Sequence, residues 1–259
     1  MNDATVSTDL APWIESATDP GESTRALARL ARFAGITGAA TAGLLARAAA
    51  RRSSIEHSAR AGHEWALAVI GRLGLDLRVN GSPPPPGVLV TGNHRSYVDI
   101  PAILAATPAI FLAKVEVGAW PLLGWGARIA HTIFVCREDA ASRKQALAQM
   151  RRVLDRGTSV ALFPEGTTTK TPGMLPFHRG SFRLAAERGY GVVPAAIRYD
   201  DPEDAWIDDE SFVAHFRRRC GRRDIRLTLD LGPVLHGSDP ESLKTRAEDW
   251  ILDRIGGPR

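Results

Sequence analysis

The sequence predicts an α/β fold, in which a mixed, mostly parallel sheet is covered by helices on both faces and preceded by a two-helix motif. From Val88 onward, short apolar runs alternate with segments of helical period, which is typical of such a sheet. A proline-rich segment separates this part from a helical N-terminal region. With 259 residues, of which 44% are hydrophobic and 24% charged, the chain can build one sizeable domain and an appendage.

The N-terminal region is expected to hold a leader and two helices. Residues 1–23 lack the basic segment followed by an apolar segment that a secretory signal requires. We interpret them as a flexible leader. Helical period runs from Thr24 to about Arg52 and resumes from about Ile55 to Leu73. The longest uncharged stretch, Phe33 to Ala46, has 14 residues, which is shorter than the ~20 that span a bilayer as a helix.

Residues 24–79 form a helical hairpin with features of a membrane-docking motif. Arg25, Arg29 and Arg32 repeat at helical spacing and form one cationic face. Two cationic amphipathic helices in tandem can lie in the interface of a membrane that contains anionic lipids. A hairpin that only packs on the following domain explains the pattern equally well, so both interpretations stay open.

The segment NGSPPPPG, residues 80–87, is expected to join the hairpin to the main domain, residues 80–259. Its four prolines lack backbone N–H groups and fix φ, which excludes a helix and a central strand. Strands are expected beyond it at residues 88–92, 109–114, 132–136, 159–164, 191–197 and 225–235. Helices are expected near residues 98–106, 118–130, 139–156, 179–188 and 239–255.

The first candidate site follows the strand expected at 88–92. Active residues of open α/β sheets collect where strands end and helices begin. His94 lies in that loop, and Asp99 lies in the first turn of the next helix. Across this turn the carboxylate can hold the Nδ1–H of the imidazole and leave Nε2 free to take a proton. Taken alone, the pair is explained more readily as a helix-capping aspartate beside a surface histidine.

The second candidate segment, Leu162–Lys170, follows another expected strand. Pro164 ends that strand, Glu165 could accept hydrogen bonds from a polyol, and Gly166 allows close approach of the backbone. The segment fails the phosphate-loop pattern, because Thr169 stands where that pattern requires glycine. The sequence contains neither a serine-hydrolase elbow nor a metal-binding motif.

The third candidate segment contributes cations. Arg137 directly follows the strand expected at 132–136, and an arginine there can hold a phosphate through two parallel hydrogen bonds. Lys114 ends the strand expected at 109–114. The competing interpretation of Arg137 is a surface ion pair with one of the two acidic residues that follow it.

Together these segments resemble the glycerolipid acyltransferase family. The family's NHxSxxD block appears at Asn93–Asp99, and its FPEGT block appears at Phe163–Thr167. Its phosphate-binding block resembles Thr132–Arg137, and its final Val-Pro block resembles Val193–Ala195. The four blocks keep the family's order and spacing over about residues 75–235, so the resemblance is specific and covers most of the chain.

The resemblance implies transfer of a fatty acyl group from a thioester, either acyl-CoA or an acyl carrier protein, to the free hydroxyl of a lysolipid. His94 would be the general base, and Asp99 would orient its ring. Backbone N–H groups of Asn93–Ser96 would stabilise the oxyanion. Five residues would bind the acceptor head group: Lys114, Arg137, Glu165, Gly166 and Thr167. Four residues would support the site: Asn93, Ser96, Pro164 and Pro194. No metal and no further cofactor are expected.

The acceptor implied by the resemblance is 1-acylglycerol-3-phosphate, which would give phosphatidic acid. Thr168 stands where phosphatidate-forming members usually carry arginine, and this departure favours another lysolipid such as lyso-ornithine lipid. A non-catalytic membrane-binding module would be favoured if His94 or Asp99 were missing, and both are present.

The charge distribution bears on partners and location. A net charge of +4 suits an anionic partner, and we expect a peripheral or monotopic protein at the cytoplasmic face of a membrane. Six arginines lie between Phe216 and Arg226, while residues 200–210 hold seven Asp or Glu. The arginines could bind anionic lipid or nucleic acid, or the two runs could neutralise each other. No nucleic-acid partner is expected, because interleaved aromatic residues are lacking. The two cysteines are expected to be reduced.

Overall fold

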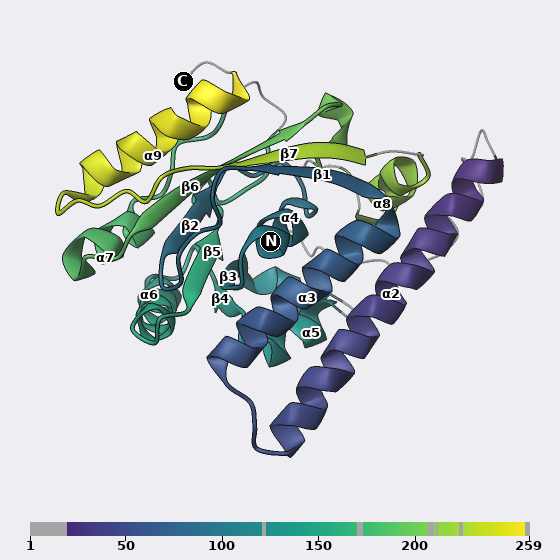
Figure 1. Ribbon diagram of the computed structural model, residues 1–259, viewed down its shortest axis with the longest axis horizontal. Coiled ribbons are helices and arrows are strands. Elements are labelled where there is room, and N and C mark those ends of the chain that lie inside the picture. The colour runs from purple at the N-terminus through teal and green to yellow at the C-terminus, as the bar shows by residue number, and fades with distance from the viewer. Residues whose placement is uncertain are drawn as a thin grey trace.

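The computed structural model describes residues 20–120, 123–169, 173–206, 210, 212–222 and 225–256. The strands within these residues are β1 (Leu75–Asn80), β2 (Leu89–Gly92), β3 (Ala109–Lys114), β4 (Ile133–Val135), β5 (Ser159–Leu162), β6 (Val192–Tyr199) and β7 (Ile225–Leu231). They form one sheet in the order β1-β7-β6-β2-β5-β3-β4 (Figure 1). Strands β6, β2, β5, β3 and β4 are parallel, whereas β7 is antiparallel to β6 and β1 is parallel to β7. The expected mixed, mostly parallel sheet is thus confirmed.

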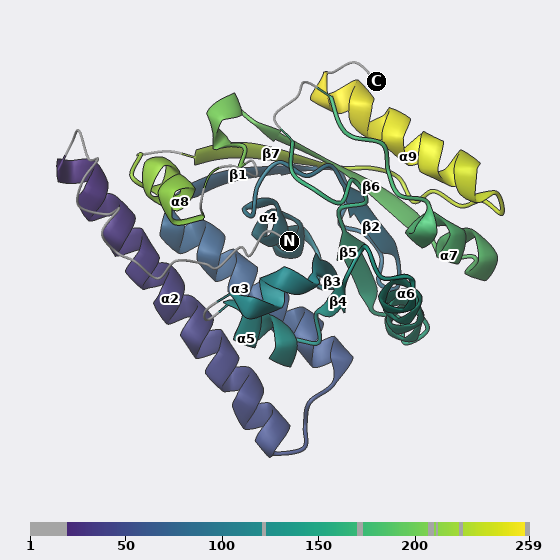
Figure 2. The same ribbon diagram turned by 180° about the vertical axis from the view of Figure 1, so that it is seen from behind.

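Helices cover both faces of this sheet. The described helices are α2 (Pro20–Ala49), α3 (Ile55–Leu73), α4 (Asp99–Ala106), α5 (Leu123–Ile129), α6 (Ala140–Leu154), α7 (Gly180–Arg188), α8 (Phe212–Cys220) and α9 (Pro240–Ile255). Short 3-10 turns lie at η1 (Val115–Ala119) and η2 (Pro202–Asp204). Helices α6, α7 and α9 lie on one face, and α3 and α4 lie on the other with α2, α5 and α8 beyond them (Figures 1 and 2).

Local sequence explains where the helices begin and end. Ser54 caps α3 by accepting a hydrogen bond from the backbone N–H of His57, and Gly74 ends the helix with φ of 70°. Asp139 caps α6 through the N–H groups of its first turn. The central strands β2 and β5 are buried along their whole length, which agrees with their short and uncharged sequences.

The expected division of the chain near residue 80 needs correction. Leu75–Val79 were assigned to the hairpin and Asn80 to the joint, but Leu75–Asn80 form β1, which pairs with β7 along its whole length. The alternation of Leu75 and Leu77 with polar residues suits an edge strand, and Gly74 separates it from α3. The proline-rich segment therefore connects two strands of the same sheet.

The expected leader is shorter than predicted. Helix α2 begins at Pro20 rather than at Thr24, because proline fits the first turn of a helix, where its missing N–H would have no partner. The rest of the leader lies outside the described residues. Among the residues that the structure covers, no helix is long and apolar enough to cross a membrane.

The arginine face of α2 points toward the domain rather than away from it. Arg29 is buried, and its Nη1 donates to the carbonyls of Cys220 at 2.9 Å and Arg222 at 2.6 Å, at the end of α8. The Nε of Arg25 donates to a third carbonyl of that turn at 2.7 Å. Unpaired carbonyls at a helix C-terminus attract cations, so this face holds α2 on α8. Of the three arginines only Arg32 is exposed.

The arginine cluster of α8 neutralises the acidic run before it. Arg219 is buried and forms an ion pair with buried Asp204 and, at 3.1 Å, with Asp201. Arg222 also pairs with Asp201, at 2.6 Å. Arg218 contacts Glu210 at 2.7 Å. These contacts favour the interpretation in which the two runs neutralise each other.

Candidate active site

His94 and Asp99 meet across the turn between β2 and α4. The Nδ1 atom of His94 lies 2.9 Å from Oδ2 of Asp99, and the Asp99 side chain is fully buried. His94 lines an apolar cavity, and its ring stacks on Phe163 with 4.0 Å between ring centroids. A buried carboxylate at Nδ1 selects the tautomer in which Nε2 is unprotonated. The pair thus has the geometry of a general base and its orienting carboxylate.

Three further donors hold the Asp99 carboxylate. The backbone N–H groups of Arg95 and Ser96 donate to Oδ2 at 2.6 and 2.8 Å. The hydroxyl of Tyr199, at the end of β6, donates to Oδ1 at 2.6 Å. Desolvation and then the adjacent Asp99 carboxylate raise the pKa of Tyr199 well above its usual value, so the phenol keeps its proton. Both carboxylate oxygens are therefore held in place.

Glu165 holds the loop that carries His94. Its Oε1 accepts the backbone N–H of His94 at 2.6 Å, and its Oε2 accepts that of Leu175 at 2.6 Å. Burial raises the pKa of Glu165 to about 7, although these two donors oppose the shift. The side chain is 5% exposed and both oxygens are occupied. This geometry does not fit the head-group role that we expected for Glu165.

The expected oxyanion site also needs correction. Of the four backbone N–H groups that we expected to contribute, those of His94, Arg95 and Ser96 already donate to buried carboxylates. A donor that is occupied in this way cannot also stabilise an oxyanion. These N–H groups instead keep the turn in the conformation that joins His94 to Asp99.

Asn93, Pro194 and Pro164 support the site through the backbone. The side chain of Asn93 donates to the carbonyl of Ile197 at 2.9 Å and accepts its N–H at 2.7 Å, which fixes the loop to β6. Pro194 lies on β6 and pairs in register with Thr91 on β2. The carbonyl of Pro164 accepts the backbone N–H of His178 at 2.9 Å.

Arg137 and Gly166 lie together beside the catalytic loop. Gly166 has φ of 85°, and a Cβ atom there would lie 3.2 Å from Nε2 of His178 and 3.6 Å from Cζ of Arg137. A side chain at this position would be strained and would also crowd both residues. Arg137 is partly buried, which lowers the pKa of its guanidinium, and no ion pair of its side chain occurs within the described residues. An unpaired cation in such a place suits an anionic ligand.

The other two expected head-group residues are Lys114 and Thr167. The Nζ of Lys114 is 3.4 Å from Oε1 of Glu116, and both side chains are about half exposed. Lys114 lines neither of the two cavities described below. Thr167 is partly buried next to Gly166 and also lines neither cavity.

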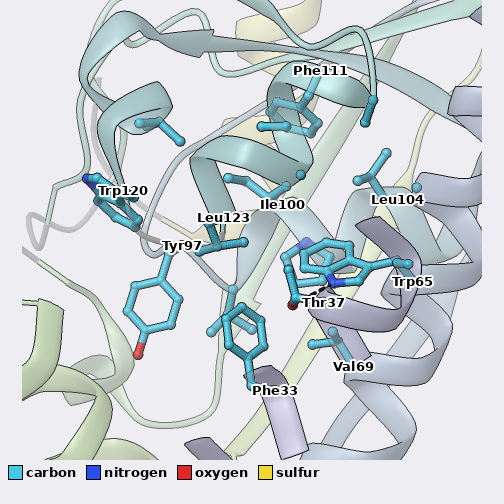
Figure 3. A pocket seen from close by; sticks show the side chains of 18 of the residues that line it. Phe33, Thr37, Trp65, Val69, Tyr97, Ile100, Leu104, Phe111, Trp120 and Leu123 are labelled. Atoms are coloured by element: carbon cyan, nitrogen blue, oxygen red, sulfur yellow. Dashed lines mark hydrogen bonds between the residues drawn. The ribbon is translucent and has the colours of Figure 1, made fainter. Parts of the chain in front are cut away.

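An apolar cavity of about 240 Å³ lies between the sheet and the N-terminal helices. Figure 3 shows Phe33, Trp65 and Leu104 among the side chains that surround it. Its lining includes His94 but no Asp, Glu, Lys or Arg within the described part of the chain. Trp65 donates from Nε1 to Oγ1 of Thr37 at 3.1 Å, so a polar group that faces this region is satisfied (Figure 3). The cavity suits a hydrocarbon chain that ends at His94.

A second, open cavity of about 960 Å³ lies on the other face of the sheet, between α6 and α7. Six lysine or arginine residues line it: Arg137, Arg143, Lys144, Arg151, Arg179 and Arg183. The two cavities approach each other near the end of β3, because Ala113 lines both. In addition, Phe163 lines the cationic cavity and stacks on His94, which lines the apolar one.

Sequence reasoning missed Tyr199, His178 and both cavities. A tyrosine that ends a strand carries no local signal of a contact with a residue one hundred positions earlier. His178 and Arg179 directly precede α7, which begins at Gly180. In the sequence, only the basic residue Arg179 beside His178 indicated an anion site. The cavities depend on how helices pack across the sheet, and periodicity does not report this packing.

Comparisons with known proteins agree with this geometry. A model of the family described as Acyltransferase matches residues 77–198, which include the catalytic loop and the Glu165 turn. The lyso-ornithine lipid O-acyltransferase of Pseudomonas aeruginosa is 36% identical over 197 residues, which cover 72% of this chain and 75% of that protein. The 1-acyl-sn-glycerol-3-phosphate acyltransferase of Neisseria meningitidis is 37% identical over 144 residues, which cover 55% of this chain and 56% of that protein.

The fold also has a counterpart among solved structures. The 1-acyl-sn-glycerophosphate acyltransferase PlsC from Thermotoga maritima superposes with a TM-score of 0.64 at 20% identity, over 91% of this chain and 96% of that one. At 20% identity, this match shows a likeness of fold alone. The 36% identical relative, in contrast, is similar in sequence over most of the length of this chain. Because the 36% identical relative covers 72% of this chain and the family model matches the region that holds His94 and Asp99, this chain belongs to the acyltransferase family.

Proposed function

We propose that this chain transfers a fatty acyl group from a soluble thioester to the free hydroxyl of a lysolipid whose head group carries a phosphomonoester or a carboxylate, at a membrane surface. The observation that carries the proposal is the contact of 2.9 Å between Nδ1 of His94 and Oδ2 of Asp99. Within the described residues Nε2 has no protein partner, and the ring lines the apolar cavity and stacks on Phe163, which lines the cationic cavity. A base in this position can act on a hydroxyl that a substrate brings there.

The proton and the acyl group follow a simple course. Nε2 of His94 takes the proton of the acceptor hydroxyl while the oxygen attacks the thioester carbonyl. Asp99 stabilises the imidazolium that forms. Collapse of the tetrahedral intermediate breaks the C–S bond, and the imidazolium returns the proton to the leaving thiolate. The products are an ester and a free thiol, and no acyl-enzyme is required.

The acyl chain would occupy the apolar cavity. Its walls include Phe33, Trp65 and Phe111, and His94 lines it as well. Each buried methylene contributes about 0.8 kcal/mol, so a fatty chain binds such a cavity strongly. The thioester carbon would then lie beside the imidazole.

The acceptor head group would bind at Arg137, Gly166 and His178. Phosphate is the group that an unpaired arginine and an open backbone turn suit best, so 1-acylglycerol-3-phosphate, which would give phosphatidic acid, is the first candidate. Lyso-ornithine lipid is the second candidate. The greater coverage of the lyso-ornithine lipid acyltransferase relative and the presence of Thr168 in place of arginine favour it.

Membrane docking would involve the outer side of α2 and the exposed part of α5. Between Ala34 and Ala46 the exposed positions of α2 carry only alanine, glycine and leucine. Trp125 on α5 is 69% exposed, and α5 packs against α2. An apolar helix side with a tryptophan at its border suits the interface of a bilayer. The protein would therefore be peripheral or monotopic, at the cytoplasmic face, where thioester donors are made.

An acceptor panel tests the proposal. Purified protein receives one labelled acyl thioester, offered both as acyl-CoA and on an acyl carrier protein, with 1-acylglycerol-3-phosphate, lyso-ornithine lipid or a lysophosphatidylcholine in mixed vesicles. We expect the His94-dependent product to form with 1-acylglycerol-3-phosphate or lyso-ornithine lipid and much less with the choline lipid, which has neither a phosphomonoester nor a carboxylate. If no lysolipid is acylated with either donor, the proposal is wrong. Cosedimentation with vesicles should fall in Leu45→Asp, while Val79→Asp, a change at an exposed residue of β1, serves as the control.

A further inference from the structure

The cationic cavity carries more positive charge than one acceptor head group requires. Besides Arg137, five lysine or arginine residues of α6 and α7 or their flanks line it: Arg143, Lys144, Arg151, Arg179 and Arg183. The acidic residue of this lining, within the described chain, is Glu187. At about 960 Å³ the cavity is as large as sites that hold an extended ligand.

Some of these cations are neutralised and others are not. Arg151 pairs with Asp155 at 3.8 Å, and Arg183 pairs with Glu187 at 3.5 Å. Lys144 on α6 and Arg179 directly before α7 are exposed, and their side chains make no ion pair or hydrogen bond within the described residues. Unpaired cations on both walls of an open cavity create a positive potential that attracts a multiply charged anion.

The position of the cavity indicates which substrate reaches it. A donor whose acyl chain fills the apolar cavity has its thioester carbon at His94, on the opposite face of the sheet from α6 and α7. The shared lining residue Ala113 and the stacking of Phe163 on His94 put the cationic cavity next to that carbon. The sulfur end of the donor can therefore continue into the cationic cavity.

We infer that Lys144 and Arg179, with their cationic neighbours at the outer part of this cavity, bind the phosphate groups of the acyl donor. The shared chemistry is a phosphopantetheine thioester, which coenzyme A and acyl carrier proteins both present. The inference rests on the proposed function and adds a donor site to it. Arg137, closer to Gly166, remains for the acceptor head group.

Donors with and without phosphate test this inference. The double variant Lys144→Gln/Arg179→Gln is assayed at saturating acceptor with acyl-CoA, with an acyl carrier protein thioester, and with an S-acyl-N-acetylcysteamine, which lacks phosphate. We expect KM for a phosphorylated donor to rise roughly fivefold at low ionic strength, since each exposed charge contributes a small screened attraction. The rise should shrink in high salt. For the phosphate-free donor kcat/KM should stay unchanged.

The control variant is Arg152→Gln/Arg156→Gln, at and just beyond the end of α6. It removes the same number of charges from exposed positions that do not line the cavity. A KM change with acyl-CoA alone, or with the carrier protein alone, supports the inference and identifies the donor. Equal changes for the phosphate-free donor, or none for either phosphorylated donor, overturn it. Absence of transfer by the wild-type protein from every donor would instead refute the proposed function.

Discussion

The two cavities beside His94 differ in almost every physical respect. The apolar cavity is narrow, lies under the N-terminal helices and has no lysine, arginine, aspartate or glutamate in its described lining. The cationic cavity is open to solvent between α6 and α7 and has six lysine or arginine residues around it. An acyl transfer to a lysolipid joins a hydrocarbon chain to polar partners. His94 lies beside both an apolar environment, which suits the hydrocarbon chain, and a cationic environment, which suits the polar partners.

The largest expected effect comes from removing the base, His94. We expect His94→Ala to lower kcat on the order of 10³-fold, because general base catalysis contributes that much. Unfolding by urea should be nearly unchanged, since the ring is partly exposed. His236→Ala, at an exposed histidine outside both cavities, is the matched control. Turnover by His94→Ala at the wild-type rate would contradict the mechanism.

A second test concerns Glu165, which holds the catalytic loop. Its pKa is raised from 4.5 to about 7 by burial, so the folded protein binds this proton more tightly than the unfolded chain does. Below pH 4.5, Glu165 therefore makes its full contribution to the stability of the folded state, and this contribution is lost as the pH rises to about 7. We expect the stability of the wild type relative to Glu165→Gln to fall on the order of 3 kcal/mol across that range.

Urea denaturation of both proteins at several pH values between 4 and 8 measures this difference. Glu187→Gln, at an exposed glutamate of α7, is the control and should show no such trend. A constant difference between wild type and Glu165→Gln over the whole range would show that Glu165 titrates normally.

A third test concerns Tyr199, which holds Asp99 from the far strand β6. We expect Tyr199→Phe to lower kcat on the order of tenfold, less than loss of the base itself, while KM for both substrates changes little. The acid limb of the pH–rate profile should move to higher pH, because an Asp99 carboxylate with one donor fewer favours the protonated imidazole.

Tyr190→Phe is the matched control, because that hydroxyl contacts Asp155 at the protein surface. A purely structural role of Tyr199 would lower stability without moving the acid limb. That outcome would remove Tyr199 from the catalytic arrangement.

The smallest expected effect probes the apolar cavity. Ala61 on α3 lines it, and Ala61→Leu should shorten the chain that fits. Because each buried methylene contributes about 0.8 kcal/mol, kcat/KM should fall roughly fourfold for each methylene that is displaced, while shorter donors are unaffected. Ala48→Leu, at an exposed position of α2, is the control. An equal effect on all chain lengths would argue against an acyl chain in this cavity.

Much of the fold could be predicted because its signals are local. The expected strand at 109–114 matches β3, and the expected helices at 139–156 and 239–255 match α6 and α9 to within two residues. β1 was missed, since its short alternating sequence follows a helix without a strong turn signal other than Gly74. α8 was missed because the arginines at its end were interpreted only as a charged cluster, and the helical period of the segment was not considered.

The candidate site was predictable in its chemistry but not in its connections. The motif blocks named His94 and Asp99, and the structure brings them together at 2.9 Å. Glu165 was expected at a head group, yet it accepts the N–H of His94, a residue 71 positions away. The sequence left open whether the arginines of α2 face a membrane or the domain, and in the structure Arg29 donates to a carbonyl 191 positions later.

Local sequence patterns were enough to predict the α/β class, the order of most elements and the residue types around His94. Each of these depends on neighbours within a few positions, where periodicity, capping and turn preferences act. The tertiary structure decided which donor meets which carboxylate and where the two cavities lie. Tyr199 reaches Asp99, and Glu165 reaches the loop, only because β6 and β5 lie on either side of β2 in the sheet. Strand order is a global property, because it minimises the free energy of the whole packed chain rather than of any segment.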